Sequence, residues 1–217
     1  MFKYILFDLD GTIINSAPGI INSIGYALEK LGEPVPGREA LYKFLGPPLQ
    51  RSFIEILGFS KEKTDRAVEY YRGNYREKGI YGCAVYPGVP ELIKSLKAGG
   101  RTVVLATSKP IIFSEKILKN IGLHEYFDFI SGSELDGSRV DKYEVIKYAL
   151  DSLKIENPSE AVMTGDREHD IIGAKKAGIA SIGVLYGYGS LFELQSAGAD
   201  YVAADTEELY EFIMQNS

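Results

Sequence analysis

Short runs of apolar residues that do not alternate with polar ones are the feature that most constrains the fold of this chain. They lie at residues 4–7, 102–106, 127–131, 161–164, 180–186 and, more weakly, 201–204. Strands that are apolar on both sides are typical of a parallel sheet covered by helices. Segments with helical periodicity separate the runs, at 88–100, 109–122, 141–155, 167–179 and 190–198. This alternation predicts an α/β fold with a Rossmann-like parallel sheet flanked by helices.

One segment interrupts the alternation. Between residues 16 and 79 the sequence carries only helical patterns, at 17–31, 38–45, 48–57 and 61–78. Turns rich in Gly and Pro, such as "GEPVPG" at 32–37, separate these patterns. We therefore predict an all-helical domain of residues 16–79, inserted after the first strand, and a discontinuous α/β core of residues 1–15 and 80–217.

Charge and hydropathy exclude several kinds of partner. The formal net charge of −6 disfavours binding to nucleic acid or to an anionic membrane surface, because both need a basic field. No apolar run approaches the roughly 20 residues of a membrane span. The N-terminus lacks the basic start and long apolar stretch of a secretory signal. We expect a cytoplasmic protein without a membrane partner, and either a monomer or a homodimer.

Polar side chains follow several predicted strands at the point where each strand ends. In open parallel sheets, ligands bind beyond the carboxyl ends of the strands, so residues at these places are candidates for a site. They are Asp8 and Asp10 after the first strand, Thr107, Ser108 and Lys109 after the second, and Asp166 and Asp170 after the fourth. Lys142 opens the predicted helix at 141–155. We expect the fold to gather these residues at one edge of the sheet.

The residue types in this group indicate phosphoryl transfer. Clustered carboxylates repel one another unless a cation holds them, and hard oxygen ligands suit Mg²⁺. The remaining residues of the group offer hydrogen-bond donors for an anion, and phosphoryl transfer depends on such positioning and charge neutralisation. A carboxylate can also be the nucleophile. One hypothesis is that Asp8 or Asp10 attacks phosphorus while the other handles a proton on the leaving oxygen.

Four motifs strengthen this interpretation. "FDLDGT" at 7–12, "LATSKP" at 105–110, Lys142 and "GDREHD" at 165–170 resemble, in order, the four motifs of the haloacid dehalogenase (HAD) superfamily of hydrolases. The helical insert is similar to the helical cap of that superfamily, and the resemblance covers essentially the whole chain. The chain resembles members of the superfamily named phosphoglycolate phosphatase and 5′-nucleotidase. The resemblance implies a phosphoric monoester hydrolase that acts on a small phosphorylated metabolite.

The resemblance also implies roles for the residues that match the motifs. Asp8 would be the nucleophile, and Asp10 the general acid and base. Thr107 and Lys142 would hold the transferring phosphoryl group, with Ser108 nearby. Many relatives carry proline directly after the lysine of the third motif, whereas Tyr143 follows it here.

The same resemblance implies a Mg²⁺ site. Asp166, the Asp8 carboxylate and the backbone carbonyl of Asp10 would bind the ion, and Asp170 would support it directly or through water. Lys109 is an alternative to Lys142 as the phosphate-binding lysine. In the loop at 44–52, Arg51 is a candidate for reaching an anionic substrate, although a plain turn with a surface arginine is an equally good interpretation.

Several functions stay open. Asp10 favours phosphoester chemistry, because dehalogenases and phosphonate-cleaving members of the superfamily lack this aspartate. Gly165 argues for a hydrolase over a sugar phosphomutase, since those enzymes usually carry a Glu-Asp pair there. A pyrophosphatase is a further alternative. A non-catalytic module that binds a phosphometabolite is the alternative from another class, and the retention of Asp8, Asp10 and Asp166 argues against it.

Overall fold

The computed structural model describes residues 1–216, which form two compact units. The core unit consists of Met1–Asn15 and the chain from Val85 onward, and the helical unit is Ser16–Ala84. The first boundary lies where the sequence predicted it. The second lies five residues later, because the short 3₁₀ helix η1 (Gly79–Tyr81) and the turn after it group with the helical unit.

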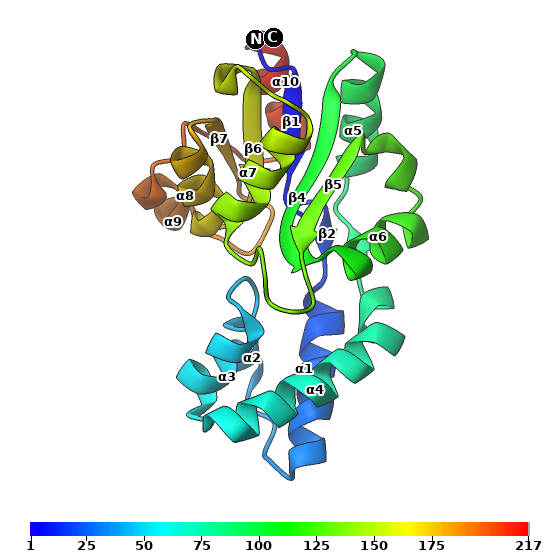
Figure 1. The fold of residues 1–217 in the computed structure, drawn as a ribbon, viewed down its shortest axis with the longest axis vertical. Coiled ribbons are helices and arrows are strands. Elements are labelled where there is room, and N and C mark those ends of the chain that lie inside the picture. Colours follow the sequence, from blue (N-terminus) through cyan, green and yellow to red (C-terminus); the bar gives the residue numbers. More distant parts are fainter. Residues whose placement is uncertain (217) are drawn as a thin grey trace. The chain divides into compact units, whose positions relative to one another are not determined.

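A parallel sheet forms the centre of the core unit (Figure 1). Within residues 1–216 it has six strands in the order β5-β4-β1-β6-β7-β8. The strands are β1 (Tyr4–Phe7), β4 (Thr102–Pro110), β5 (Phe129–Ser133), β6 (Ala161–Gly165), β7 (Ala180–Val184) and β8 (Tyr201–Ala203). The prediction of an α/β fold with a parallel sheet is confirmed.

The register of the three central strands levels their carboxyl ends. Tyr4 pairs with Thr102 of β4 and Ala161 of β6, and three residues later Phe7 lies between Leu105 and Thr164. Strand β1 ends at Phe7 and β6 at Gly165, at the same edge of the sheet, where Asp8 and Asp166 follow them. Strand β4 continues to Pro110, so Thr107, Ser108 and Lys109 lie in its last residues, whereas the sequence had predicted them after the strand.

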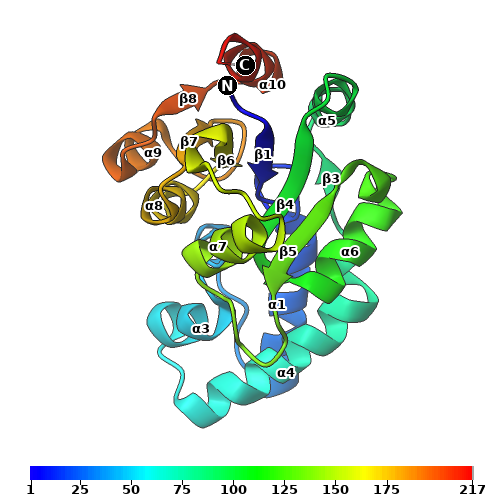
Figure 2. The same ribbon diagram turned by 45° about the horizontal axis from the view of Figure 1, so that its top comes forward.

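Helices cover both faces of this sheet, which explains why the strands are apolar throughout. Figure 2 shows α7 and α8 on one face and α5 and α10 on the other. Consecutive β1 residues Ile5, Leu6 and Phe7 are all buried, although their side chains alternate between the faces. The core-unit helices are α5 (Val89–Ala98), α6 (Ile111–Asn120), α7 (Lys142–Ser152), α8 (Glu168–Ala177), α9 (Leu191–Ala197) and α10 (Thr206–Gln215).

Helix α10 was not predicted from the sequence. Its start is marked by Asp205, whose side chain accepts hydrogen bonds from the backbone N–H groups of Glu207 and Glu208. An Asp followed by acidic residues is a helix N-terminal signal, and buried Leu209 and Ile213 lie four residues apart on one face. Both signals were present in the sequence and could have identified the helix.

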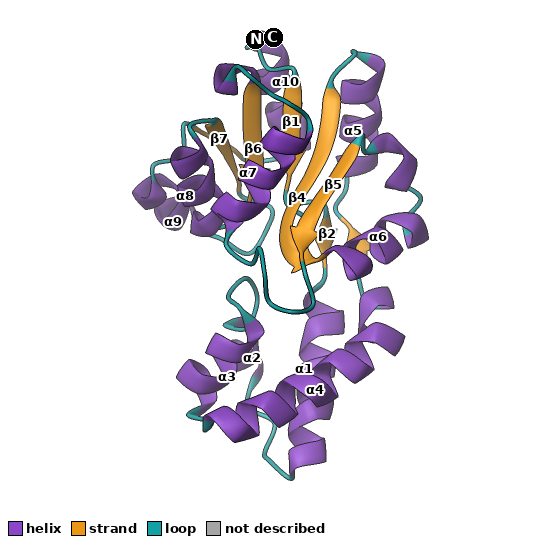
Figure 3. Ribbon diagram, in the orientation of Figure 1, coloured by secondary structure: helices purple, strands orange, loops and turns teal. Residues whose placement is uncertain are grey.

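The described part of the helical unit is built from helices and loops (Figure 3). Its helices are α1 (Ala17–Leu31), α2 (Arg38–Tyr42), α3 (Leu49–Leu57) and α4 (Lys61–Glu77). Short strands β2 (Ile14–Asn15) and β3 (Ala84–Val85) pair where the chain enters and leaves the unit. Buried Phe53 contacts the rings of Phe44 and Phe59, at centroid distances of 5.2 and 5.8 Å. No helix among residues 1–216 has the length and apolarity needed to cross a bilayer.

Candidate active site

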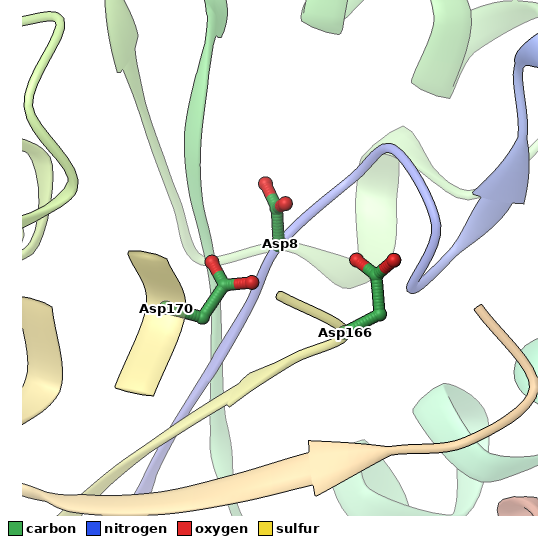
Figure 4. A group of neighbouring side chains, drawn as sticks. All are labelled: Asp8, Asp166 and Asp170. Carbon is green, nitrogen blue, oxygen red and sulfur yellow. The ribbon is translucent and has the colours of Figure 1, made fainter. Parts of the chain in front are cut away.

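Three buried carboxylates meet at the carboxyl edge of the sheet. Each of Asp8, Asp166 and Asp170 offers a carboxylate oxygen, and these oxygens all lie within 4.8 Å of one another. Figure 4 shows Asp8 and Asp166 extending from the ends of neighbouring strands, and Asp170 from the start of α8. The Asp8 N–H donates to the Thr164 carbonyl at 2.9 Å, which continues the β1–β6 pairing as far as the site. Parallel pairing thus brings together aspartates that are far apart in sequence.

Backbone and hydroxyl donors orient Asp166. Thr12 Oγ1 donates to Oδ1 of Asp166 at 3.3 Å, and the Tyr188 N–H donates to Oδ2 at 2.8 Å. The segment that carries Tyr188 follows β7 and passes very close to the aspartate: a Cβ on Gly187 would lie 2.3 Å from Asp166 Cβ, and one on Gly189 would lie 1.9 Å from the Asp166 carbonyl oxygen. Sequence reasoning missed this segment. Its signal was a Gly-Tyr-Gly sequence directly after a predicted strand.

Lys142 links two of the three carboxylates. Its Nζ lies 2.8 Å from Oδ1 of Asp8 and 2.8 Å from Oδ1 of Asp170, and it donates to the Ala106 carbonyl at 3.1 Å. The side chain is 5% exposed. Asp141 caps α7 by accepting from the Tyr143 N–H, so the helix starts with Lys142 aimed at the sheet edge.

Asp10 has a different cationic partner. Lys109 Nζ donates to Oδ2 of Asp10 at 2.6 Å, and the lysine side chain is 7% exposed. The two lysines that the sequence left as alternatives for phosphate therefore contact different aspartates: Lys142 contacts Asp8 and Asp170, and Lys109 contacts Asp10. Asp10 lies outside the side-chain cluster of Asp8, Asp166 and Asp170.

Thr107 and Ser108 lie near the end of β4, directly before Lys109 in the sequence. Thr107 is buried, and its Oγ1 accepts from the Lys109 N–H at 3.2 Å. The Ser108 carbonyl accepts from Ser133 Oγ at 2.8 Å. Their predicted contact with a phosphoryl group stays a prediction.

Arg51 belongs to the helical unit, at the start of α3. Its Nε donates to Oε1 of Glu55, one helical turn along, at 2.8 Å. The arginine side chain is 62% exposed, so this pair contributes little to stability. A role for Arg51 in binding an anionic substrate stays a prediction.

Burial and repulsion by neighbouring carboxylates raise the pKa values of two acids of the cluster, Asp8 and Asp166. Burial raises the pKa of Asp8 to about 6, and Asp170 adds to the increase, while the Lys142 ammonium works against it. Burial also raises the pKa of Asp166 well above its usual value, with Asp170 and Asp8 contributing and the Tyr188 N–H opposing. Burial by itself lowers the pKa of Lys142, but the two carboxylates outweigh this effect and raise it. The charged forms of Asp8 and Asp166 are therefore costly in this site.

A divalent cation fits this arrangement. The Lys142 ammonium pairs with Asp8 and Asp170, which leaves the cluster of three carboxylates with an excess of negative charge in a buried site. Oxygen ligands at this spacing suit a hard divalent cation. Burial, with repulsion by neighbouring carboxylates adding to it, raises the pKa values of Asp8 and Asp166, and such a cation would favour their charged forms. The three aspartates are therefore the residues that could hold a metal ion.

Known proteins resemble this chain over nearly its whole length. The sequence matches the family model described as "Haloacid dehalogenase-like hydrolase" over residues 5–184. A 5′-nucleotidase of Pseudomonas aeruginosa is 40% identical over 212 residues, which cover 98% of this chain and 96% of the relative. The tyrosine-protein kinase PtkA of Mycobacterium tuberculosis is 34% identical over 96% of this chain and 72% of its own length. A phosphoglycolate phosphatase of Vibrio parahaemolyticus is 29% identical, with 97% and 96% covered.

A solved structure agrees with these relatives. The crystal structure described as a predicted phosphatase from Clostridium acetobutylicum superimposes with a TM-score of 0.94. It is 46% identical in sequence, and the match covers 99% of both chains. The chain therefore has the same fold as a structure described as a predicted phosphatase.

The buried position of Lys142 leads to a prediction about stability. Replacing Lys142 by Met leaves Asp8 and Asp170 buried without their cationic partner, and removing one member of a buried pair costs about 3–5 kcal/mol. Urea unfolding of the metal-free protein measures this loss.

Lys147→Met is the matched control, because Lys147 lies on the same helix and pairs with Asp151 at the exposed surface. Its removal is expected to cost less than about 1 kcal/mol. Equal losses for the two variants would contradict the prediction.

Proposed function

The chain belongs to the haloacid dehalogenase-like hydrolase family and is a phosphatase of that family; from this premise we propose that it hydrolyses small phosphomonoesters with Mg²⁺, through an aspartyl-phosphate on Asp8. The observation that carries the proposal is the cluster of Asp8, Asp166 and Asp170 at the sheet edge, with Asp10 beside it on the same loop. Close together in space, the chain thus offers a candidate nucleophile in Asp8, candidate metal ligands in the cluster and a separate candidate acid in Asp10.

Asp8 is the proposed nucleophile. An oxygen of its carboxylate attacks phosphorus, the bond from phosphorus to the leaving oxygen breaks, and Asp10 gives a proton to that oxygen. Water then attacks the phosphorus of the acyl phosphate while Asp10 takes its proton, which releases inorganic phosphate and restores Asp8. The different lysine partners of the two aspartates support their different roles: Lys142 contacts Asp8, whereas Lys109 contacts Asp10.

Mg²⁺ is the proposed cofactor, held by Asp8, Asp166 and the Asp10 carbonyl, with Asp170 in support. When bound, it would supply charge neutralisation at the phosphoryl oxygens. The residues of the chain provide the rest of the site: Thr12 and the Tyr188 N–H orient Asp166. Thr107, Ser108 and Lys142 are proposed to hold the transferring phosphoryl group.

The proposed substrates are nucleoside 5′-monophosphates and phosphoglycolate-like esters. The names of two relatives support this class, a 5′-nucleotidase at 40% identity and a phosphoglycolate phosphatase at 29%. Nucleoside monophosphates are the first to test, because the relative with that name is the more similar one. Arg51 is proposed to contribute to binding of an anionic substrate.

Replacing Asp8 and replacing Asp10 by asparagine are predicted to reduce turnover to different extents. Asp8→Asn removes the nucleophile and should reduce phosphate release from nucleoside monophosphates to background. Asp10→Asn should lower turnover by about 10²–10⁴-fold, the usual contribution of a general acid or base. Phosphate release measures turnover, and acid quenching followed by hydroxylamine treatment detects the acyl phosphate.

Asp151→Asn, an exposed change on α7, is the control and should leave turnover unchanged. An Asp8→Asn variant that hydrolyses as fast as the unmodified protein would contradict the mechanism. A kinase activity like that in the name of the mycobacterial relative would give a different result, since phosphate from ATP would appear on tyrosine, which is stable to hydroxylamine.

Metal binding is predicted to stabilise the fold in a pH-dependent manner. The pKa of Asp8 is about 6 in the folded chain against 3.8 as its ordinary value, so without a cation its contribution favours folding at low pH and is lost as pH rises through about 6. Mg²⁺ needs ionised carboxylates, so its effect has the opposite sign: it grows as pH rises through about 6 and fades as pH falls below. At 100 times its Kd the ion should add about 2.7 kcal/mol.

The melting temperature with and without Mg²⁺, measured from pH 5 to pH 8, checks this prediction without any assay of activity. Asp166→Asn should abolish the shift, because Asp166 is one of the three clustered carboxylates. Asp136→Asn, in the exposed loop where Asp136 bonds Ser138, should leave it intact. A shift of the same size at pH 5 and pH 8 would contradict the assignment of the ion to these residues.

A further inference from the structure

A buried lysine at the end of β4, Lys109, has no role of its own in the proposed phosphatase mechanism. Lys109 Nζ donates to Oδ2 of Asp10 at 2.6 Å, with side chains that are 7% and 22% exposed. Burying an ammonium is costly unless it is paired and hydrogen-bonded, so this contact constrains where both side chains lie. Sequence reasoning considered Lys109 only as an alternative phosphate ligand.

The two oxygens of Asp10 differ in their environment. Oδ2 is held by Lys109, whereas Oδ1 is buried and has no hydrogen-bond partner among residues 1–216. A buried carboxylate oxygen without a partner is costly and calls for an explanation. An oxygen kept available to exchange a proton with the leaving group and then with water supplies one.

The backbone around Lys109 holds the lysine in place. The pairing of β4 with β5 changes register between Ala106 and Pro110, an irregularity of the kind that redirects side chains beside active sites. Two β5 contacts support this segment. Ser133 Oγ donates to the Ser108 carbonyl, and Gly132 allows close approach, because a Cβ there would lie 2.8 Å from the Lys109 carbonyl oxygen.

We propose that Lys109 is a positioning residue for Asp10: its ammonium holds Oδ2 and so directs Oδ1 toward the proton that Asp10 gives to the leaving oxygen and later takes from water. This inference rests on the proposed function. Lys109 touches neither proton in this assignment and acts only through Asp10. Its counterpart Lys142 contacts the nucleophile instead, so each catalytic aspartate has its own lysine.

The dependence on the leaving group tests the proposal. An alkyl phosphate such as a nucleoside monophosphate needs a proton on its leaving oxygen, whereas p-nitrophenyl phosphate leaves readily without one. The quantity to compare is kcat/KM, which reports the step in which the leaving group departs. Lys109→Met should lower kcat/KM for the alkyl phosphate at least tenfold more than for p-nitrophenyl phosphate, and by no more than the about 10²–10⁴-fold that the whole acid contributes.

Three further variants make the outcome decisive. Lys109→Arg keeps a cation and should restore most of the activity on the alkyl phosphate. Lys109→Met made in an Asp10→Asn background should cost less than threefold more, because Asp10 has no acid left to position. Lys119→Met, which removes an exposed pair with Glu115 on neighbouring α6, should change nothing.

An equal loss on the two substrates would overturn the proposal and indicate a phosphate-binding or purely structural role. So would a loss in the Asp10→Asn background as large as in the unmodified protein. Failure of the proposed function is distinguishable from both results. It would appear in the Asp10→Asn variant alone, as a loss of kcat/KM that is the same for the alkyl phosphate and for p-nitrophenyl phosphate. The role assigned to Lys109 would then be wrong as well.

Discussion

The hydrogen bond from the Asp8 N–H to the Thr164 carbonyl, 2.9 Å long, continues the pairing of β1 with β6 beyond the last strand residue. Because the two strands run parallel and in level register, the residues that follow them, Asp8 and Asp166, emerge side by side. Asp8, Asp166 and Asp170 are all buried where they meet at this edge. Burial then makes their charges costly, which raises the pKa values of Asp8 and Asp166 and favours a cation between them.

The burial of these carboxylates also explains why lysine side chains lie against them. Lys142 offsets part of the negative charge by pairing with Asp8 and Asp170, and its own burial is offset by those partners in return. Removing either the lysine or its carboxylate partners would leave a buried charge without compensation. The buried charges of the site therefore lower the stability of the fold, and the packing of the core must offset this loss. The surrounding core provides that support, with the α7 and α8 residues Val145, Ile146 and Ala174 packed against β1, β4 and β6.

Close backbone approach is the second structural requirement of the site. The segment at 187–189 passes so near Asp166 that side chains at its two glycines would collide with the aspartate. Gly11, at a positive φ of 86°, allows the turn after Asp10, and a Cβ there would lie 2.2 Å from Oδ2 of Asp166. Glycine at these positions lets the backbone of two loops enclose one carboxylate, with the Tyr188 N–H as a donor to it.

Much of this protein follows from its sequence alone. The apolar runs identified the sheet strands, the break in alternation identified the helical segment, and the polar residues after each strand identified Asp8, Asp166 and Asp170, because parallel topology brings such residues to one edge. Only the tertiary structure decided which lysine contacts which aspartate. Lys109 and Asp10 are 99 residues apart, and their contact depends on the irregular end of β4. The donors from Thr12 and Tyr188 were likewise beyond sequence reasoning, since hydrogen bonds between loops depend on side-chain and backbone direction, whereas hydropathy reports only which side of an element is buried.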